Sequence, residues 1–442
     1  MYENHSDDYS DDLYGADSFA GTPDGQPTGH DYVSGGPLGR RVSTSATWSQ
    51  PELTSGAERM KLAVEPRSTI ERPLRLAYIG PNFQIGGVRQ HAIALAKFLD
   101  SDRIRLDRFL LTDPTGLTGK AHDNLPAPVA ICDDRALDRL ADECDVALVW
   151  GSGLNRLRRL RGLQRVFVAH GETAWTRTTL QSLAPVIDHV VAVSERVKRR
   201  VCDGFPTTTI LNGVDTARLS LANPVEAVRE RFAFAASDFV IGAVGRLTRE
   251  KCFDLLIETV SRLPARFKLL LVGSGSRSAE LLDFANRLIP GRFAVVAADD
   301  YLGDYFAAMD SLAMVSAHEG FSLVVAEAMM CGRPVIATPV GCVPELISDR
   351  VSGVVVEPTV DSIAAAATGL ANHPHWARGV AEEGRQIART RLLASRMARD
   401  YERLLIRLCG TATDAAASKT PIRAASMLAD GVMYEDEAGS EA

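Results

Sequence analysis

Two charged pairs in the second half of the chain have residue types and spacing that suit a ligand site. Glu319 and Glu327 stand eight positions apart in HEGFSLVVAEAMMCGRPVIATPVG (318–341), and Glu327 lies inside an otherwise apolar helical segment. Burying an unpaired carboxylate costs on the order of several kcal/mol. Glu327 therefore either lies on a solvated stripe or accepts hydrogen bonds from hydroxyls of a bound ligand, and its apolar neighbours favour the ligand.

The second pair is cationic. Arg246 and Lys251 stand five apart in GRLTREK, between a strand-like run and an amphipathic helix. A helix N-terminus already favours anions through its free amides and its dipole. Two added cations would leave the turn positively charged unless an anion binds, and a diphosphate suits that charge. Two solvated surface cations are the alternative.

Several smaller features accompany these pairs at predicted turns. Ser322 is a suitable N-cap for the helix that carries Glu327, and Glu319 lies on the turn before it. Glycines permit a close backbone approach to a ligand, or simply a tight turn. His170 follows a buried strand, whereas His91, His189 and His318 are interpreted as structural. The glycine turns in question hold Gly86, Gly87, Gly273 and Gly275.

The elements that must position these residues alternate between strands and helices. Strand-like runs rich in Val, Ile and Leu come in two sets, and helical segments lie between most of them. The first set is LRLAYIG (74–80), RFLLTD (108–113), VALVWG (146–151), RVFVAHG (165–171), HVVAVS (189–194) and TTILNGV (208–214). The second set is FVIGAVGRL (239–247), KLLLVGSG (268–275), AVVAA (294–298), LAMVSA (312–317), PVIATPV (334–340) and VVVEP (354–358).

This alternation predicts two doubly wound α/β domains with a cleft between them. In open parallel sheets ligands bind beyond the carboxyl ends of the strands, which is where the charged turns fall. The predicted parts are a disordered acidic and polar extension (1–70), a first Rossmann-like domain (71–220), a second (221–390), a helix that crosses back to the first domain (391–410) and a disordered tail (411–442).

Composition narrows the class of protein. The 442 residues are 46% hydrophobic and carry a formal charge of −7, which argues against nucleic-acid binding by bulk electrostatics. Seven cysteines without a CxxC pair give neither a disulfide framework nor a metal motif. No signal-peptide pattern and no apolar run of roughly 18 residues is present, so a cytoplasmic protein is expected.

Together the motifs resemble the retaining glycosyltransferases of the GT-B fold, in the large group called family four. The likeness covers roughly residues 74 to 405, and the two-glutamate stretch is its most specific part. The matching segments are GG (86–87), AHG (169–171), VAVSERVKRRV (191–201), TILNGVDTARL (209–219), GRLTREK (245–251), LVGSG (271–275), EGFSLVVAEAMMCGRPVIAT (319–338) and VGCVPELI (340–347).

The resemblance implies a nucleotide-diphosphate-sugar donor held by the second domain. Arg246 and Lys251 would bind its diphosphate in place of a metal ion, so neither a metal nor a cofactor is expected. Glu319 would contact sugar hydroxyls near the reacting carbon and Glu327 the ribose hydroxyls. The backbone amides that would meet sugar and phosphate belong to Gly320, Phe321, Ser322 and Leu323.

From the acceptor domain, the resemblance brings His170 and the Gly86–Gly87 loop to the site. It also implies retention of anomeric configuration by front-face attack, with the departing phosphate helping to deprotonate the acceptor. Three features depart from the family pattern: Cys252 and Cys342 stand where glycine is usual, and the loop 297–306 lacks an early glycine. These departures affect the expected donor more than the reaction class.

Other activities remain alternatives. A GT-B protein could instead be a sugar epimerase or phosphorylase, or a binding protein without catalysis, and a dehydrogenase would need an acidic residue after a complete GxGxxG. The acceptor, whether a glycan, a lipid or a small molecule, is not specified. The basic segment NRLRRLRGLQR (155–165) is either a solvated face or a weak peripheral contact with an anionic membrane.

Overall fold

The computed structural model describes residues 72–83, 86–113, 125–151, 154–160, 162–298 and 301–417. The predicted disordered extension of residues 1–70 lies outside these ranges. The predicted tail of residues 411–442 lies outside them from residue 418 onward. Residues 411–417 instead continue a helix, and their sequence TATDAAA is rich in alanine, the best helix former.

The first sheet has seven parallel strands in the order β3-β2-β1-β4-β5-β6-β7. Six of them match the predicted runs, and the short edge strand β3 was not predicted. The strands are β1 Leu74–Gly80, β2 Ile104–Leu111, β3 Val129–Ile131, β4 Val146–Val149, β5 Gln164–Ala169, β6 His189–Ala192 and β7 Thr207–Thr209.

The second sheet has six parallel strands in the order β10-β9-β8-β11-β12-β13. All six match the predicted runs. The strands are β8 Phe239–Val244, β9 Phe267–Val272, β10 Phe293–Val296, β11 Ser311–Met314, β12 Val335–Ala337 and β13 Val354–Val355. The predicted boundary near residue 220 falls between β7 and β8, and the boundary itself stays a prediction.

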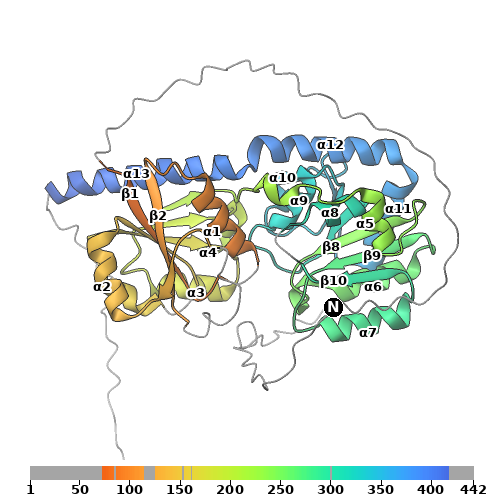
Figure 1. Ribbon diagram of the computed structural model, residues 1–442, viewed down its shortest axis with the longest axis horizontal. Helices are drawn as coiled ribbons and strands as arrows, with labels where there is room; N and C mark the ends of the chain where they lie inside the picture. The colour runs from red at the N-terminus through yellow and green to blue at the C-terminus, as the bar shows by residue number, and fades with distance from the viewer. Residues whose placement is uncertain are drawn as a thin grey trace, which may run out of the picture. The chain divides into compact units, whose positions relative to one another are not determined.

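Helices connect the strands and cover both sheets (Figure 1). The first set comprises α1 Gly87–Phe98, α2 Asp134–Glu143, η3 Leu154–Arg159, α3 Ala174–Ser182, α4 Glu195–Val201 and η4 Thr216–Leu219. The second comprises α5 Val225–Arg231, η5 Arg249–Lys251, α6 Phe253–Arg262, α7 Ser278–Leu288, α8 Gly303–Ala308, α9 Leu323–Met330, α10 Val343–Leu346, α11 Val360–Asn372, α12 Pro374–Arg391 and α13 Ala394–Ala417. The predicted α/β fold with two doubly wound parallel sheets is thereby confirmed.

The central strands are apolar on both faces because helices cover both. β4 is buried along its whole length, and so is β11. Such strands show nearly continuous Val, Ile and Leu instead of alternation, which is why the sequence reveals them. Two buried clusters form the core, and the larger one includes side chains of both sheets.

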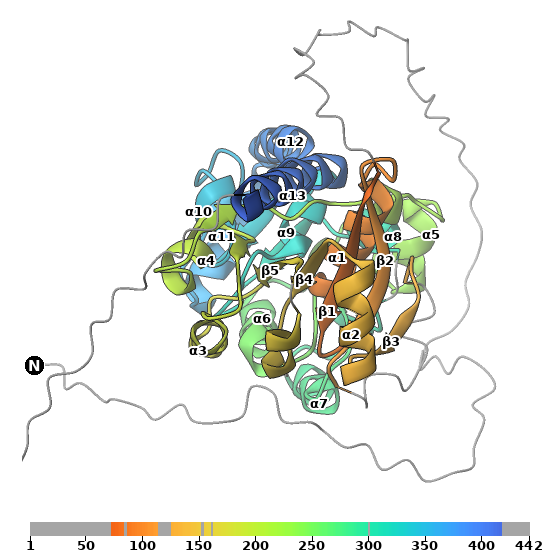
Figure 2. The same cartoon turned by 90° about the vertical axis from the view of Figure 1, so that its left-hand side faces the viewer.

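The last two helices pack against helices from different halves of the chain. α12 packs against α9, and α13 packs against α1 (Figures 1 and 2). Around the start of α13, backbone hydrogen bonds of 2.7 and 3.0 Å join Val214 to Leu392 and Ala394. On α13, Glu402 accepts a hydrogen bond of 2.7 Å from the backbone N–H of Asp100. The C-terminal helix thus completes the layer over the first sheet.

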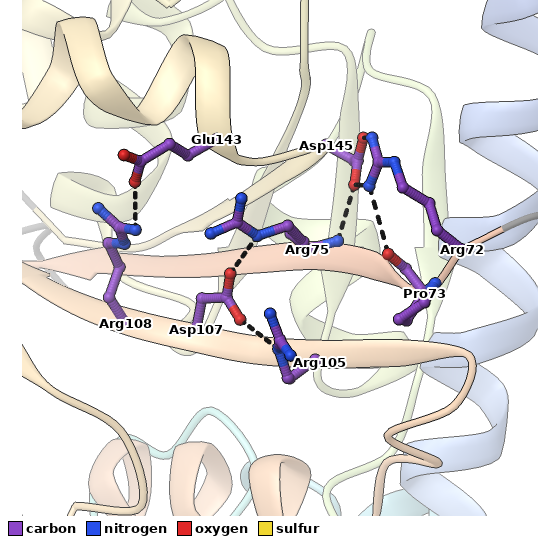
Figure 3. A network of polar contacts seen from close by, with 8 residues as sticks. All are labelled: Arg72, Pro73, Arg75, Arg105, Asp107, Arg108, Glu143 and Asp145. Atoms are coloured by element: carbon purple, nitrogen blue, oxygen red, sulfur yellow. Dashed lines mark hydrogen bonds and ion pairs between the residues drawn. The ribbon is translucent and has the colours of Figure 1, made fainter.

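A row of ion pairs ties the strands at the start of the described chain (Figure 3). Arg72 and the backbone N–H of Arg75 both donate to Asp145, and the Arg75 side chain donates to Asp107 on β2. Burial alone would raise the pKa of Asp145, but the hydrogen bonds from Arg72 and Arg75 hold it below its usual value. The network fixes β1 between β2 and the segment that leads into β4.

Candidate active site

The turn between β11 and α9 is the centre of the predicted site. Ser322 adopts the left-handed backbone conformation, with φ 74° and ψ 76°, immediately before α9. The prediction that its side chain caps the helix is wrong, because a capping residue needs an extended backbone to reach the first amides. The Ser322 hydroxyl is instead buried and lacks a hydrogen-bond partner among the described residues.

Glu319, on the same turn, is paired with a predicted phosphate ligand. The Nζ atom of Lys251 lies 2.5 Å from Oε1 of Glu319, and the Ser316 hydroxyl donates to that oxygen over 2.9 Å. The side chains of Lys251 and Glu319 are only 17% and 11% exposed. A cation at the end of η5 and a carboxylate on the turn before α9 therefore neutralise each other in this structure.

Arg246, the other predicted diphosphate ligand, lies at the surface. Its side chain is 61% exposed, and its guanidinium lies 3.5 Å from the carboxylate of Glu250, one turn along the chain. The structure thus brings Lys251 into the Glu319 pair and leaves Arg246 outside it. Arg246 is available to an anion that approaches from solvent.

The departure at Cys252 has a backbone consequence. Cys252 has φ 52° and ψ 40°, the left-handed conformation that glycine adopts without steric cost. It stands between η5 and α6, directly after Lys251. A side chain at this position strains the turn that holds the predicted phosphate ligand.

The glycines of LVGSG serve the contact between two turns. A Cβ atom on Gly273 would lie 1.8 Å from the carbonyl oxygen of Gly245, and one on Gly275 would lie 2.5 Å from that of Leu247. The backbone N–H of Leu247 also donates to Ser274 over 2.9 Å. The absence of side chains at Gly273 and Gly275 is therefore required by the neighbouring turn, whether or not a ligand approaches them.

Glu327 is buried and ion-paired, so the solvated stripe is excluded. Its carboxylate is 2.5 Å from a guanidinium nitrogen of Arg218, on η4 after the NGVD segment. Burial raises the pKa of Glu327, and the charge and hydrogen bond of Arg218 oppose that rise. A cavity of about 10 Å³, room for roughly one water molecule, adjoins both residues. Sequence reasoning missed Arg218, although the motif TILNGVDTARL contains it.

His170 lies beside the central turn. A Cβ atom on Gly320 would come within 1.8 Å of the His170 carbonyl oxygen, so the two backbones are in direct contact. The Ser194 hydroxyl, from the segment after β6, donates to the carbonyl of Gly320 over 2.9 Å. The structure thus brings the AHG turn and the HEGFS turn together.

The Gly86–Gly87 loop also reaches this turn. Gly86 has φ 154°, a conformation that side chains disfavour, and Gly87 begins α1. A Cβ atom on Gly87 would lie 3.8 Å from the Leu323 side chain. The structure therefore gathers Gly87, His170 and residues 319–323 in one place.

A buried carboxylate in this region escaped the sequence analysis. Glu172, two residues after His170, accepts a hydrogen bond of 2.5 Å from Arg196 at the start of α4. The backbone N–H of Arg196 donates to Glu345, and its guanidinium donates to the carbonyl of Pro339. Arg196 thereby links the segment after β6 to the segment after β12. The sequence signal that could have revealed Arg196 was its position within VAVSERVKRRV.

The basic segment of residues 155–165 uses its leucines for the core. Leu157, Leu160 and Leu163 are buried, Arg159 pairs with acidic residues of α2, and Arg165 pairs with Asp188. A membrane contact by this segment stays a prediction. None of the helices in the described ranges is both long and apolar enough to span a bilayer. Nor do those ranges contain three His, Cys, Asp or Glu side chains grouped closely enough to hold a metal ion.

Comparison with known families gives two matches along the chain. Residues 85–218 match the model described as Glycosyltransferase Family 4, and residues 238–373 match the model described as Glycosyl transferases group 1. The first matched region contains Gly86, Gly87 and His170, and the second contains the other predicted site residues.

Two curated bacterial proteins are similar over most of their length. A GDP-mannose-dependent alpha-(1-6)-phosphatidylinositol monomannoside mannosyltransferase of Mycolicibacterium smegmatis is 30% identical over 285 residues, which cover 57% of this chain and 74% of the relative. A GDP-mannose-dependent monoacylated alpha-(1-6)-phosphatidylinositol monomannoside mannosyltransferase of Corynebacterium glutamicum is 28% identical, over 65% of this chain and 82% of the relative.

The fold is similar to that of a solved protein. The structure of Anabaena HepE in complex with UDP-glucose superposes with a TM-score of 0.66 at 21% identity. The match covers 76% of this chain and 100% of the other. At this identity the likeness concerns the fold.

Proposed function

Because the chain belongs to the group 1 glycosyltransferases, which are also numbered family four, we propose that it is a retaining, metal-independent member. It is a glycosyltransferase of the GT-B type. In the proposed reaction, a sugar passes from a nucleotide-diphosphate sugar to an acceptor hydroxyl, and the anomeric configuration is kept.

The observation that carries this proposal is the state of the turn at residues 319–322. It holds a buried hydroxyl without a partner on Ser322, a left-handed backbone at the same residue, and a carboxylate paired with Lys251. Strained backbone and unsatisfied polar groups persist where a ligand needs them. A phosphorylated sugar would supply hydroxyls for Glu319 and oxygens for Ser322 and Lys251.

Each charged residue then has a role in binding the donor. Lys251 exchanges Glu319 for a phosphate oxygen, and Arg246 approaches the same diphosphate from the surface. The amides of residues 320–323 face the sugar and the phosphate, where the start of α9 favours negative charge. Glu319, released from Lys251, accepts hydrogen bonds from sugar hydroxyls near the reacting carbon.

In this proposal Glu327 accepts hydrogen bonds from the ribose hydroxyls while it remains paired with Arg218. A carboxylate has two oxygens and about four acceptor positions, so the ion pair with Arg218 leaves capacity for a hydroxyl. The adjoining cavity of about 10 Å³ is too small for a ribose. Donor binding therefore requires the η4 segment and α9 to move apart.

The chemical step needs little covalent participation from the protein. The acceptor hydroxyl attacks the anomeric carbon on the face that the diphosphate leaves, and the departing phosphate takes the hydroxyl proton. Lys251, Arg246 and the amides of α9 stabilise the charge that grows on the diphosphate. Closure of the His170 turn over the Gly320 turn excludes water and limits donor hydrolysis.

Two donors are the first to test. The similar proteins named above depend on GDP-mannose, and HepE was solved with UDP-glucose. The purified chain, treated with EDTA, should release GDP from GDP-mannose or UDP from UDP-glucose slowly in water and faster with methanol as a surrogate acceptor. NMR of the methyl glycoside should show the α configuration of the donor.

The variant Arg246→Ala should lower this release by at least about 10-fold, the size expected for loss of one charged contact to a transition state. Arg262→Ala is the matched control, because Arg262 has the same 61% side-chain exposure and lies at the far end of α6. No nucleotide release from a panel of UDP-, GDP- and ADP-sugars would contradict the transferase. A β-glycoside product would contradict retention.

A further inference from the structure

Four aromatic side chains form a line of hydrogen bonds from the His170 turn to the C-terminal helix. The Tyr401 hydroxyl on α13 lies 3.1 Å from Nε2 of His91 on α1. Nδ1 of His91 lies 3.1 Å from the Tyr78 hydroxyl on β1, which lies 3.0 Å from Nε2 of His170. Tyr401 and His170, the two ends of the line, are 231 positions apart in the sequence (401 minus 170).

The line runs through the core. Tyr78, His91 and Tyr401 are fully buried, and the His91 ring contacts the rings of Tyr401 and His170 at centroid distances of 5.5 and 4.9 Å. Burial lowers the pKa of His91 to about 3 and lowers that of His170 well below its usual value. Both imidazoles are therefore neutral near pH 7, and each has one N–H and one lone pair.

Neutral imidazoles give the line a direction. Each ring donates on one side and accepts on the other, so the state of one end decides the state of the other. If Tyr401 donates to His91, then His91 donates to Tyr78, and Tyr78 donates to Nε2 of His170. If Tyr401 accepts, every bond reverses, and Nε2 of His170 carries the hydrogen.

The Tyr401 end decides between these two states. Among the described residues, the hydroxyl of Tyr401 has His91 as its sole hydrogen-bond partner. If that hydroxyl accepted the hydrogen bond from His91, its own hydrogen would be buried without an acceptor. A buried donor without an acceptor costs free energy, so this state is the less stable of the two. Tyr401 therefore donates, and the line runs from α13 toward His170.

The direction of these hydrogen bonds fixes which ring nitrogen of His170 carries the hydrogen. With Nε2 accepting from Tyr78, the ring hydrogen lies on Nδ1. Nδ1 makes no hydrogen bond to a described residue. It is also not among the polar atoms that are both buried and without a partner, so it is accessible and open to a ligand. The carbonyl of the same residue is in contact with Gly320 of the donor turn.

We propose that Tyr401, His91 and Tyr78 are positioning residues that hold His170 as the Nδ1–H tautomer, so that it offers the site a hydrogen-bond donor and not a base. The inference rests on the proposed function, because the oxygen that would accept this hydrogen bond belongs to the sugar donor or the acceptor. It leaves deprotonation of the acceptor to the departing phosphate. It also makes α13 a part of the reaction centre.

The tautomer can be observed directly in the full-length protein. Histidine labelled with ¹⁵N shows by proton–nitrogen correlation which ring nitrogen carries the hydrogen, and His170→Gln assigns the signal. The wild type should show Nδ1–H at His170. Tyr401→Phe should populate the Nε2–H form, because the group that fixes the direction has been removed. In a Tyr78→Phe background, adding Tyr401→Phe should change nothing more.

Glu402→Gln is the matched control. Glu402 is the next residue on α13 and also anchors that helix to the first half of the chain, through Asp100 and Arg103, but it is outside the line. It should leave the tautomer as in the wild type. A wild-type ring protonated at Nε2 would overturn the proposal, and so would a Tyr401→Phe spectrum identical to the wild type or an equal shift in Glu402→Gln.

Activity gives a second reading with UDP-glucose and GDP-mannose as probes. Tyr401→Phe should lower kcat for nucleotide release severalfold and leave KM for the nucleotide sugar unchanged, while Glu402→Gln keeps both values. Equal loss in the two variants would mean that α13 acts only by packing. A wild type that is inactive with every donor would count against the proposed function, and the tautomer result would still decide the present inference.

Discussion

At the scale of single residues, the pair of Arg218 and Glu327 shows a charge whose partner comes from elsewhere in the fold. Removing one partner of a buried pair leaves an uncompensated charge and costs about 3–5 kcal/mol, whereas replacing both by apolar side chains is often neutral. Arg218→Met should therefore lower the free energy of unfolding by about 3 kcal/mol. The double variant with Glu327→Met should recover most of that loss in urea titrations at pH 7. A double variant no more stable than the single one would refute the account.

Cys252 provides a second test at this scale. A non-glycine residue in the left-handed region costs roughly 1–2 kcal/mol, part of which glycine returns through its greater freedom in the unfolded chain. Cys252→Gly should raise the free energy of unfolding by up to about 1 kcal/mol. Cys252→Ala keeps the strain and should give no gain. Equal effects of the two substitutions in thermal unfolding would show that the backbone conformation is not the cause.

Residue types along the sequence revealed only one side of each contact. Glu327 was recognisable because a carboxylate is out of place in an apolar helix, but Arg218 is 109 positions away and stands in a segment without such a contrast. The same holds for His91, which looked structural because a single imidazole on an apolar helix face usually is. Tyr78 lies 13 positions before it on a strand and Tyr401 lies 310 positions after it, so only the fold brings the line together.

At the scale of elements, strands were predictable where both faces are buried and helices cover them. β3 was missed because its three residues lie at an edge and are not fully buried, so they lack a continuous apolar run. The ends of the elements cannot be read from residue types alone, because Ser322 looks like an ordinary N-cap until its backbone angles are known. The glycines of LVGSG were readable as turn residues, but their contact with the turn after β8 was not.

The contact between the His170 turn and the Gly320 turn can be tested at this scale. Gly320→Ala places a Cβ atom 1.8 Å from the His170 carbonyl oxygen, so the two segments must separate. We expect a lower melting temperature and a loss of nucleotide release. In Gly379→Ala, nothing lies within 4 Å of the added atom, which sits in the middle of α12.

That control should raise the free energy of unfolding by about 0.5–1 kcal/mol, the gain of alanine over glycine in a helix. Both variants add one methyl group, so they differ only in what surrounds that group. A Gly320→Ala protein that is as stable and as active as the wild type would show that the two turns need not touch.

At the scale of the whole molecule, buried histidines make stability depend on pH. His91 has a pKa of about 3 in the folded state, against about 6.5 when unfolded, so the unfolded chain binds more protons between these values. The contribution of His91 is complete above pH 6.5 and is lost as the pH falls. At pH 5 the loss is about 2 kcal/mol. The contribution of Glu327 to stability changes with pH in the opposite direction, because burial raises its pKa.

Urea titrations at pH 7.5 and pH 5.0 check this prediction. The wild type should lose more unfolding free energy on acidification than His91→Gln, which cannot titrate, and the difference should be about 2 kcal/mol. Comparing each protein with itself at two pH values cancels the packing cost of the substitution. Equal losses in the two proteins would mean that His91 is protonated as readily in the folded state as in the unfolded chain.

The docking of α13 on α1 has a consequence for synthesis. Tyr401, Leu404 and Leu405 are buried on α13, and the ribosome makes α1, which ends at Phe98, 303 residues before it reaches Tyr401 (401 minus 98). Domains usually fold in order as the chain emerges. Here the first half must wait, with the surface of α1 uncovered, until the second half has been translated. The nascent chain is therefore open to chaperones for almost the whole time of its production.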